Sequence, residues 1–158
     1  MPLKLDLTVA AIAEHGGRFL FVQERAARRV VLNQPAGHLE PGESLVEAVV
    51  RETREETGRE FRPDAVTGIY LWQGPVGRTV LRVAFSGRIG ERDAASKLDR
   101  AIIRTLWLDR DQLAARAVEH RSPLVLLGVD DFLRGVRYPL DLVTHVPAAS
   151  LALRAAAG

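Results

Sequence analysis

Three glutamates near the end of one predicted helix are the residues of this chain best suited to chemistry. Glu52, Glu55 and Glu56 follow an i, i+3, i+4 spacing, so their carboxylates converge on one sector of a helix surface. Anions near a helix C-terminus oppose the macrodipole by about 0.3–1 kcal/mol each. Like charges at i, i+4 cost about another 0.2–0.5 kcal/mol per pair. Arg51 can relieve one of these charges but not all three.

Two interpretations fit such a cluster. The simpler is a solvated acidic face, which is the usual meaning of an isolated E-x-x-E-E. The other is that a cation completes the cluster. Mg²⁺ suits carboxylates combined with water and substrate phosphates, because it is hard, octahedral and dehydrates reluctantly. We therefore expect a Mg²⁺ site, with Mn²⁺ as an alternative.

The helix that carries the cluster has clear boundaries. Ser44 and Glu47 form a capping box that predicts a helix start at Ser44. Gly58 stands where a helix stop is expected, and Pro63 lies a few residues beyond it. One side of this helix is apolar, and it consists of Leu45, Val46, Val49, Val50 and Thr53.

The spacing of the whole stretch favours the metal site. It resembles the Nudix box, G-x5-E-x7-R-E-U-x-E-E-x-G-U, and the chain therefore resembles the Nudix hydrolase family. The fixed positions of the box are Gly37, Glu43, Arg51, Glu52, Glu55, Glu56 and Gly58. Thr53 and Arg59 depart from the pattern, since bulky apolar residues are usual there. Both are packing positions, so the departures concern packing and leave the acidic residues in place.

The resemblance implies a role for each residue of the box. Glu52 and Glu56 would bind Mg²⁺, Glu55 a second ion or its water, and the Gly37 carbonyl would be a further ligand. A glycine at that position lets the backbone approach an ion without an intervening Cβ. Arg51 would orient the glutamates, and Glu43 would brace the loop against the helix. The alternative for these last two is a surface ion pair worth about 0–1 kcal/mol.

The general base is the least defined part of this site. Nudix enzymes often recruit a carboxylate from a loop ahead of a strand such as 102–108, which makes Asp99 the leading candidate. Glu91 and Asp93 follow it, and for each of the three a plain solvated loop acid is the favoured interpretation. Glu55 or Glu56 could take the same role.

Other segments resemble one group within the family, the NudJ-type Nudix phosphatases. They are Asn33–Glu40, Arg121–Val125 and Arg137–Leu140. That group hydrolyses nucleoside tri- and diphosphates and the pyrophosphates of hydroxymethylpyrimidine and thiamine. Leu32 stands where the group tends to have Trp, which could alter substrate preference.

Three residues are candidates for substrate contacts, each with a structural alternative. Trp72 could stack on a heterocycle or belong to the core. Arg82 could reach phosphate or point to solvent, and Gln34 could hydrogen-bond a base edge. Tyr138 is interpreted as a packing residue. The four histidines are scattered without zinc-site spacing.

Composition excludes several classes. The chain has 158 residues, 47% of them hydrophobic, which suits a single domain spanning residues 1–158 with a frayed tail from about 147. It has no cysteine, so neither disulfides nor thiolate chemistry are expected. Neither a transmembrane run nor a leader is visible, and a cytoplasmic protein is the default expectation. The net charge is +2, without the basic cluster that nucleic-acid binding needs.

The elements that must position the site alternate between strands and helices. Strands are predicted at 5–13, 19–22, 30–32, 65–72, 79–85 and 102–108. Polar or charged loops are predicted at 25–29 and 90–99. Helices are predicted at 44–57, at 109–117 and from the Ser122-Pro123 N-terminal signal to about 133. This order gives an α/β protein with a mixed sheet between helices, which is also what the Nudix resemblance implies.

Three functions remain open from the sequence. The first is a Mg²⁺-dependent hydrolase of phosphoanhydride bonds in small nucleotides or pyrimidine-type diphosphates. The second is a Nudix-fold module that binds a nucleotide without cleaving it, although every acid of the box is retained. The third is an RNA-directed pyrophosphohydrolase, whose binding would fall steeply with salt. The oligomeric state does not follow from the sequence.

Overall fold

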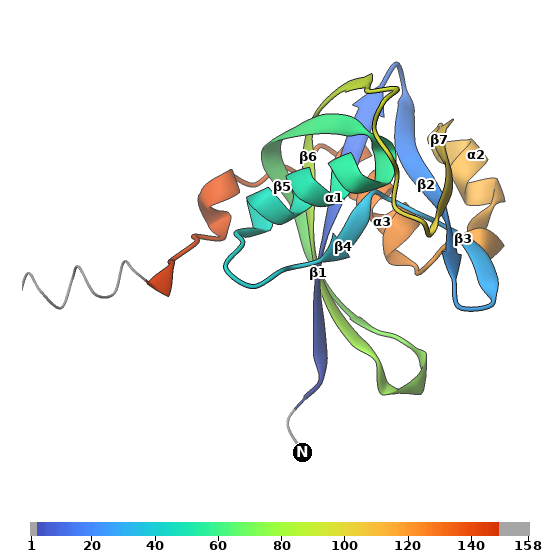
Figure 1. Cartoon of the computed structure of the whole chain (residues 1–158). Helices are drawn as coiled ribbons and strands as arrows, with labels where there is room; N and C mark the ends of the chain where they lie inside the picture. Colours follow the sequence, from blue (N-terminus) through green and yellow to red (C-terminus); the bar gives the residue numbers. More distant parts are fainter. Residues whose placement is uncertain (1–2, 149–158) are drawn as a thin grey trace, which may run out of the picture.

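The computed structural model describes residues 3–148, and Figure 1 shows their arrangement. The strands are β1 (Leu5–His15), β2 (Arg18–Ala26), β3 (Arg29–Asn33), β4 (Ala36–His38), β5 (Arg59–Gln73), β6 (Thr79–Arg92) and β7 (Ile102–Leu108). The helices are α1 (Leu45–Thr57), α2 (Arg110–Ala115) and α3 (Leu124–Leu133). Three short 3₁₀ turns occur at Pro75–Gly77, Ala117–Glu119 and Leu140–Leu142.

The strands form one mixed sheet with β1 at its centre. The main order is β3-β2-β1-β6-β5, with β4 paired to β1 and β7 paired to β2. β1 and β6 are parallel from Leu5↔Thr79 to Ala13↔Gly87, and the other pairs are antiparallel. The mixed sheet between helices that the sequence predicts is therefore confirmed.

Helices cover both faces of the sheet, which explains the unbroken apolar run of β1. In Figure 1, α1 lies on one side of the central strands and α3 on the other. Val9, Ala11 and Ala13 pack in the cluster that includes Ala48 and Val49 of α1. Ala10 and Ile12 pack in the opposite cluster with residues of α2 and α3. Alternate residues of a strand point to opposite faces, so a strand buried on both faces must be apolar at every position.

The hairpin of β1 and β2 opens into two halves. β1 and β2 are paired only at Glu14↔Phe19 and His15↔Arg18, next to their turn. Beyond that point β2 pairs with β3 and β7, while β1 pairs with β4 and β6. The separation leaves room between the two halves of the sheet, beside α1.

The boundaries of α1 agree with the prediction. The side chain of Ser44 accepts from the backbone N–H of Glu47, and the Glu47 side chain accepts from the N–H of Ser44, so both halves of the capping box are present. Gly58 ends the helix in the left-handed region with φ of 67°. Thr53 is fully buried, and its hydroxyl donates to the carbonyl of Val49 at 2.7 Å, so a threonine satisfies this packing position.

Several strands are longer than predicted. β5 begins at Arg59, directly after α1, and β6 continues to Arg92. The polar loop predicted at 25–29 is only a tight turn between β2 and β3, and the charged loop predicted at 90–99 begins inside β6. The two long strands stay paired because register shifts within β5 absorb its bends. The extensions were not predicted because exposed, charged strand residues show little alternation of apolar and polar side chains. β4 was not predicted at all.

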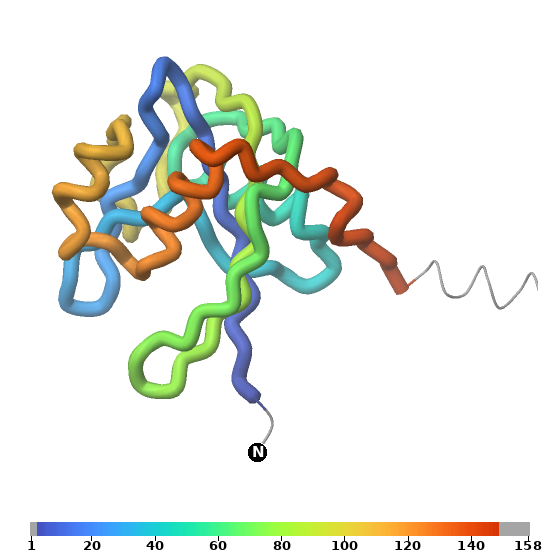
Figure 2. Tube along the Cα trace, turned by 180° about the vertical axis from the view of Figure 1, so that it is seen from behind, coloured from blue at the N-terminus to red at the C-terminus, as the bar shows by residue number. Residues whose placement is uncertain are grey.

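The C-terminal part follows the prediction in its helices, but Tyr138, interpreted as a packing residue, is 48% exposed. α3 begins at Leu124, whose N–H donates to the Ser122 hydroxyl at 3.3 Å, and Pro123 already has helical angles. Tyr138 exchanges two backbone hydrogen bonds of 2.8 Å with Val66 of β5, which fixes the segment after α3 beside β5, the last strand of the main sheet order (Figure 2). Most of the predicted tail, 149–158, lies outside the described residues. None of the described helices combines the length and apolarity that a membrane span requires.

Candidate active site

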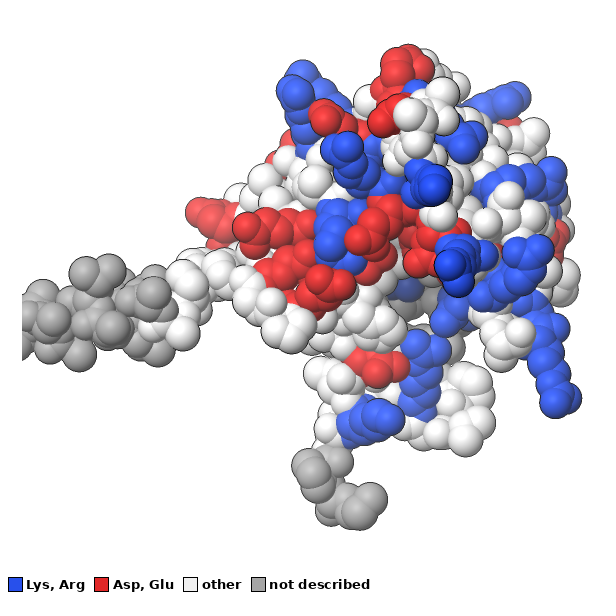
Figure 3. All heavy atoms as spheres, in the orientation of Figure 1, with Lys and Arg blue, Asp and Glu red and all other residues white. Residues whose placement is uncertain are grey.

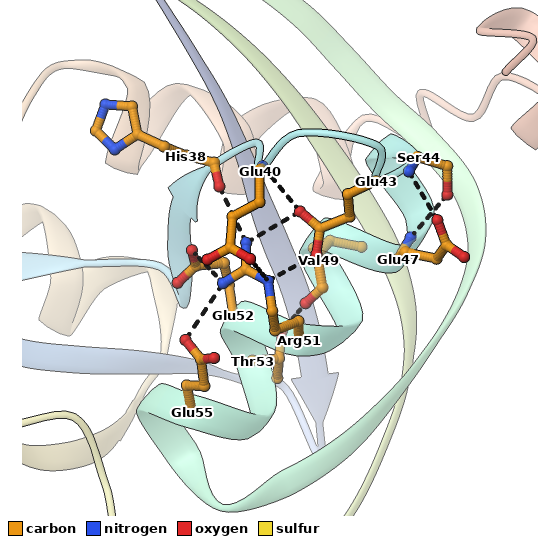
Figure 4. A network of polar contacts seen from close by, with 10 residues as sticks. All are labelled: His38, Glu40, Glu43, Ser44, Glu47, Val49, Arg51, Glu52, Thr53 and Glu55. Atoms are coloured by element: carbon orange, nitrogen blue, oxygen red, sulfur yellow. Dashed lines mark hydrogen bonds and ion pairs between the residues drawn. The ribbon is translucent and has the colours of Figure 1, made fainter. Parts of the chain in front are cut away.

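Arg51 is the centre of a polar network on α1 (Figure 4). Its guanidinium donates to both carboxylate oxygens of Glu43 at 2.6 and 3.1 Å and to the carbonyl of His38 at 3.0 Å. It also donates to Glu52 at 2.9 Å and to Glu55 at 3.3 Å. Glu43 in turn accepts from the backbone N–H of Glu40 at 3.0 Å. Arg51 thus joins the loop before the helix to two of its glutamates.

The pKa values of the acids in this network shift in opposite directions. Hydrogen bonds from Arg51 hold the pKa of Glu43 below its usual range. Burial raises the pKa of Glu52, and the bonds from Arg51 counter only part of that rise. The same partners raise the pKa of Arg51 itself, so the guanidinium stays charged.

The carboxylate of Glu52 lies directly against the backbone of Gly37. A Cβ placed on Gly37 would come within 2.1 Å of the Glu52 carboxyl carbon and of one of its oxygens. Glycine is therefore required by this close approach and not by an unusual backbone angle. The contact joins β4 to α1 at the point where the Nudix resemblance expects a backbone carbonyl and a carboxylate to share an ion.

Glu56 is the most buried acid of the cluster. Its side chain is 7% exposed, and it accepts from the backbone N–H of Ala36 at 3.0 Å. Burial, followed by the neighbouring charges of Glu24, Glu52 and Asp99, raises the pKa of Glu56 to about 9. A buried carboxyl with no cationic partner among the described residues is costly when ionised, and a cation would compensate that cost.

The donor set fits a hard cation such as Mg²⁺. It combines carboxylate oxygens with a backbone carbonyl, the ligands that Mg²⁺ prefers. Across residues 3–148, however, acidic and histidine side chains do not gather three together closely enough to hold an ion. Glu52 and Glu55 face Arg51 in this arrangement, and Glu56 faces Ala36.

A cleft of about 310 Å³ begins at Glu52 and Glu56 and runs between the two halves of the sheet. Figure 3 shows acidic side chains gathered over α1, with basic side chains around them. The cleft takes side chains from six strands, α1 and the start of α3. Its charged lining consists of Glu24, Glu40, Glu52, Glu56, Arg78, Arg82 and Arg121. Its other walls include Thr8, Asn33, Gly37, His38, Trp72, Val80 and Leu124.

Two of the three predicted substrate contacts lie in this cleft. Trp72 lines it from β5, and Arg82 lines it from β6. Arg82 is only 6% exposed, and burial lowers its pKa to about 10. Gln34 does not line the cleft: it is 2% exposed, and its amide donates to the carbonyl of Val125 at 2.7 Å. Its oxygen accepts from Arg82 at 3.5 Å, so Gln34 lies behind Arg82.

The three loop acids lie outside the cleft, at different distances from the box. The backbone N–H of Asp99 donates to the carbonyl of Glu55 at 2.9 Å, which places Asp99 beside the acidic end of α1. Its carboxylate accepts from the N–H of Ala101 at 2.8 Å. Asp93 lies against Gly58, and Glu91 is on the exposed end of β6.

Sequence reasoning assigned no role to several residues of the cleft. Glu24, Asn33 and Arg121 form one hydrogen-bonded group there, and Thr8 and Arg78 complete the walls. Asn33 and Arg121 belong to segments that carried the NudJ-type resemblance, so a signal for them existed. Glu24 follows an apolar strand without any motif, and nothing local marks it.

Fold and site together define the class of protein. The model of the NUDIX domain matches residues 4–127, most of the chain. The chain therefore belongs to the Nudix family, and it is a hydrolase of pyrophosphate linkages. This membership favours the enzyme over the non-catalytic binding module.

Individual relatives agree with this class. The chain is 34% identical to the phosphatase NudJ of Escherichia coli K12 over 140 residues, 89% of this chain and 91% of the relative. The structure of a NUDIX hydrolase from Nitrosomonas europaea has 44% identity and a TM-score of 0.87, covering 90% of this chain and 98% of that one. The structure of a MutT protein from Methanosarcina mazei has 25% identity and a TM-score of 0.65, covering 85% and 94%.

Proposed function

We propose that this protein is a Mg²⁺-dependent hydrolase of phosphoanhydride bonds in small nucleotides. The substrate class is nucleoside tri- and diphosphates or pyrimidine-type diphosphates, such as those of hydroxymethylpyrimidine and thiamine. The reaction is attack of water on phosphorus. One observation carries the proposal: Glu52 against Gly37 and the buried Glu56 form an acidic end to a cleft whose other walls are basic and aromatic.

Glu52, Glu56 and the carbonyl of Gly37 would hold the ion, and Glu55 would serve a second ion or its water. An ion held there gathers charge on the phosphoryl oxygens and lowers the pKa of bound water. The carboxylate of Glu55 is exposed and, within the described chain, accepts a hydrogen bond from Arg51 alone, so it is free to turn toward the substrate.

Arg51 and Glu43 position these groups. Arg51 reaches the loop through His38 and Glu43 and the helix through Glu52 and Glu55, so it couples the two parts of the box. Because Arg51 stays protonated, its guanidinium orients the carboxylates whether they are ionised or protonated.

Asp99 is our proposed general base. Of the three loop acids it is the one whose backbone is hydrogen-bonded to Glu55, at 2.9 Å, and whose charge contributes to the raised pKa of Glu56. Glu55 and Glu56 are the alternatives. The leaving group would occupy the far end of the cleft, where Trp72 offers a ring for stacking and Arg82 a cation.

The proposal is tested by release of phosphate or pyrophosphate from a panel of nucleotides, hydroxymethylpyrimidine pyrophosphate and thiamine pyrophosphate. We expect turnover with Mg²⁺ and none with EDTA. Glu52→Gln should remove most of it, whereas the matched control Glu60→Gln, an exposed glutamate outside the cleft, should not. Equal turnover by the two variants, or turnover that persists in EDTA, would contradict the site assignment.

A further inference from the structure

Arg82 carries a buried charge that no carboxylate of residues 3–148 contacts directly, although the charges of Glu24 and Glu56 act on it from farther away. The residue is 6% exposed, and within the described chain it forms no ion pair with a carboxylate. Among residues 3–148 it donates to two neutral oxygens, those of Asn33 at 3.3 Å and Gln34 at 3.5 Å. Its Nε has no partner within this part of the chain, and neither has the hydroxyl of Thr8, its 5% exposed neighbour in register on β1. Two buried, unpartnered polar groups in one wall of a cleft point to a ligand.

Glu24 is the complementary group in the same cleft. Alternation along β2 places this side chain on the same face as the buried Val22, and it lines the cleft. The carboxylate is 9% exposed and accepts from Arg121 at 3.2 Å and from Asn33 at 3.4 Å, both on Oε1. Its Oε2 accepts no hydrogen bond from the described residues, so it remains for a ligand.

Asn33 shows what kind of group fits between these two side chains. Its NH₂ donates to Glu24, and its oxygen accepts from Arg82. Glu24 can only accept and Arg82 can only donate, so together they select a group with a donor beside an acceptor, in that order. The N–H of an amino group beside a ring nitrogen, as in cytosine, adenine or a 4-aminopyrimidine, has the same pattern as this amide.

A ring with an oxo group at that position has the opposite pattern. The oxygen of uracil or hypoxanthine would face the carboxylate of Glu24, and the adjacent N–H would face the guanidinium of Arg82. Both contacts are repulsive, and a buried polar group left unsatisfied costs about 1–3 kcal/mol, or about 5- to 150-fold in affinity.

We propose that Glu24 and Arg82 are specificity-determining residues that make this cleft select amino-substituted over oxo-substituted heterocycles. The inference rests on the proposed function, because it names the leaving-group class of the same site. Trp72, on the strand beside β6 in the same wall, supplies the surface on which the selected ring stacks.

The experiment compares CMP with UMP, which differ only in this ring edge, by calorimetric binding in EDTA. CMP should bind about 5- to 150-fold more tightly. Glu24→Gln should bring the ratio close to one, because a glutamine amide can donate as well as accept. The control Glu60→Gln should keep the wild-type ratio. A wild-type ratio near one, no binding of either nucleotide, or a ratio unchanged by Glu24→Gln would overturn the proposal.

Arg82→Met separates recognition from structure. Arg82→Met leaves the buried oxygens of Asn33 and Gln34 without this donor, so the melting temperature should fall moderately, while CMP binding falls by a similar factor. A large drop in melting temperature with the CMP preference retained would show that Arg82 is structural, and would overturn its part of the proposal.

Turnover distinguishes this inference from the proposed function. With Mg²⁺, kcat/KM should be higher for CTP than for UTP and for ATP than for ITP. Hydrolysis of all four at equal efficiency would overturn the selectivity and leave the hydrolase intact. Preferential CMP binding without hydrolysis of any substrate would do the reverse.

Discussion

At the scale of single residues, the contact between Gly37 and Glu52 is the most sensitive point of the site. In Gly37→Ala the added Cβ would displace the Glu52 carboxylate, which is the mobile end of a side chain. The melting temperature should therefore change little. Loss of a positioned ligand should lower Mg²⁺ affinity or activity by at least about 10- to 100-fold. Gly90→Ala is the control, since its Cβ would meet neighbours at an ordinary 3.5 Å. Equal activity of the two variants would refute the role of this contact.

Asp99 permits a test of the general base. Asp99→Asn keeps the shape of the side chain and its hydrogen bond to the N–H of Ala101, but it removes the basic oxygen. If Asp99 takes the proton from water, kcat should fall by roughly 10²- to 10⁴-fold with KM little changed. Glu91→Gln, at an exposed acid near the end of β6, should retain activity. An unaltered kcat in Asp99→Asn would transfer the role to Glu55 or Glu56.

Glu56 predicts a pH dependence of the metal-free protein. Burial raises its pKa to about 9 in the folded state from a reference value of 4.5. Between these values the folded protein holds a proton that the unfolded chain has released, so this contribution to stability is complete below pH 4.5 and is lost as pH rises toward 9.

The measurement is urea unfolding in EDTA from pH 5 to 9. Because Gln cannot ionise, Glu56→Gln should gain stability relative to wild type as pH rises. Glu55→Gln, at an exposed position, should run parallel to wild type. Parallel curves for all three proteins would mean that Glu56 does not carry the buried proton.

At the scale of elements, α1 holds the site because both of its ends are determined by local chemistry. Ser44→Ala removes the side-chain acceptor for the N–H of Glu47, which should cost about 0.5–2 kcal/mol of unfolding free energy. Ser44→Asp should restore most of it, because aspartate is an equally good N-cap near the positive end of the helix. Denaturant unfolding measures both, and failure of aspartate to restore stability would indicate a different role for Ser44.

The strands contribute to the site because β1 and β2 separate, and the sequence of neither strand indicates this separation. β1 and β2 part after two residue pairs, and the cleft occupies the space that opens. Glu24 faces it through the ordinary alternation of β2, two residues after the buried Val22, and the pairing of β1 with β6 places Thr8 beside Arg82. A slip of one residue in either pairing would turn these side chains to the opposite face.

At the scale of the whole molecule, the acidic end of α1 should make stability depend on divalent cations. A ligand of the native state stabilises it by mass action, by about 2.7 kcal/mol at a concentration 100 times its Kd. Adding Mg²⁺ should raise the melting temperature of the wild type, and EDTA should reverse the effect. Glu56→Gln should lose most of the rise. An identical response of wild type and mutant would show that the ion binds elsewhere.

The sequence alone determined the helix, its caps and the residues of the box. Their signals are local: Ser44 and Glu47 are three residues apart, and the glutamates follow the helical period. The mixed sheet between helices was predictable for the same reason, since the alternation of apolar segments and their lengths reflect burial. The spacing of the box likewise anticipated family membership.

Only the tertiary structure decided which other residues join the site. Thr8, Glu24, Asn33 and Arg82 lie on four strands, and Arg121 lies in the segment before α3, far apart along the chain. They meet because of strand pairing and the opening between β1 and β2. These features depend on contacts between distant segments, and the period of a single strand contains no information about them.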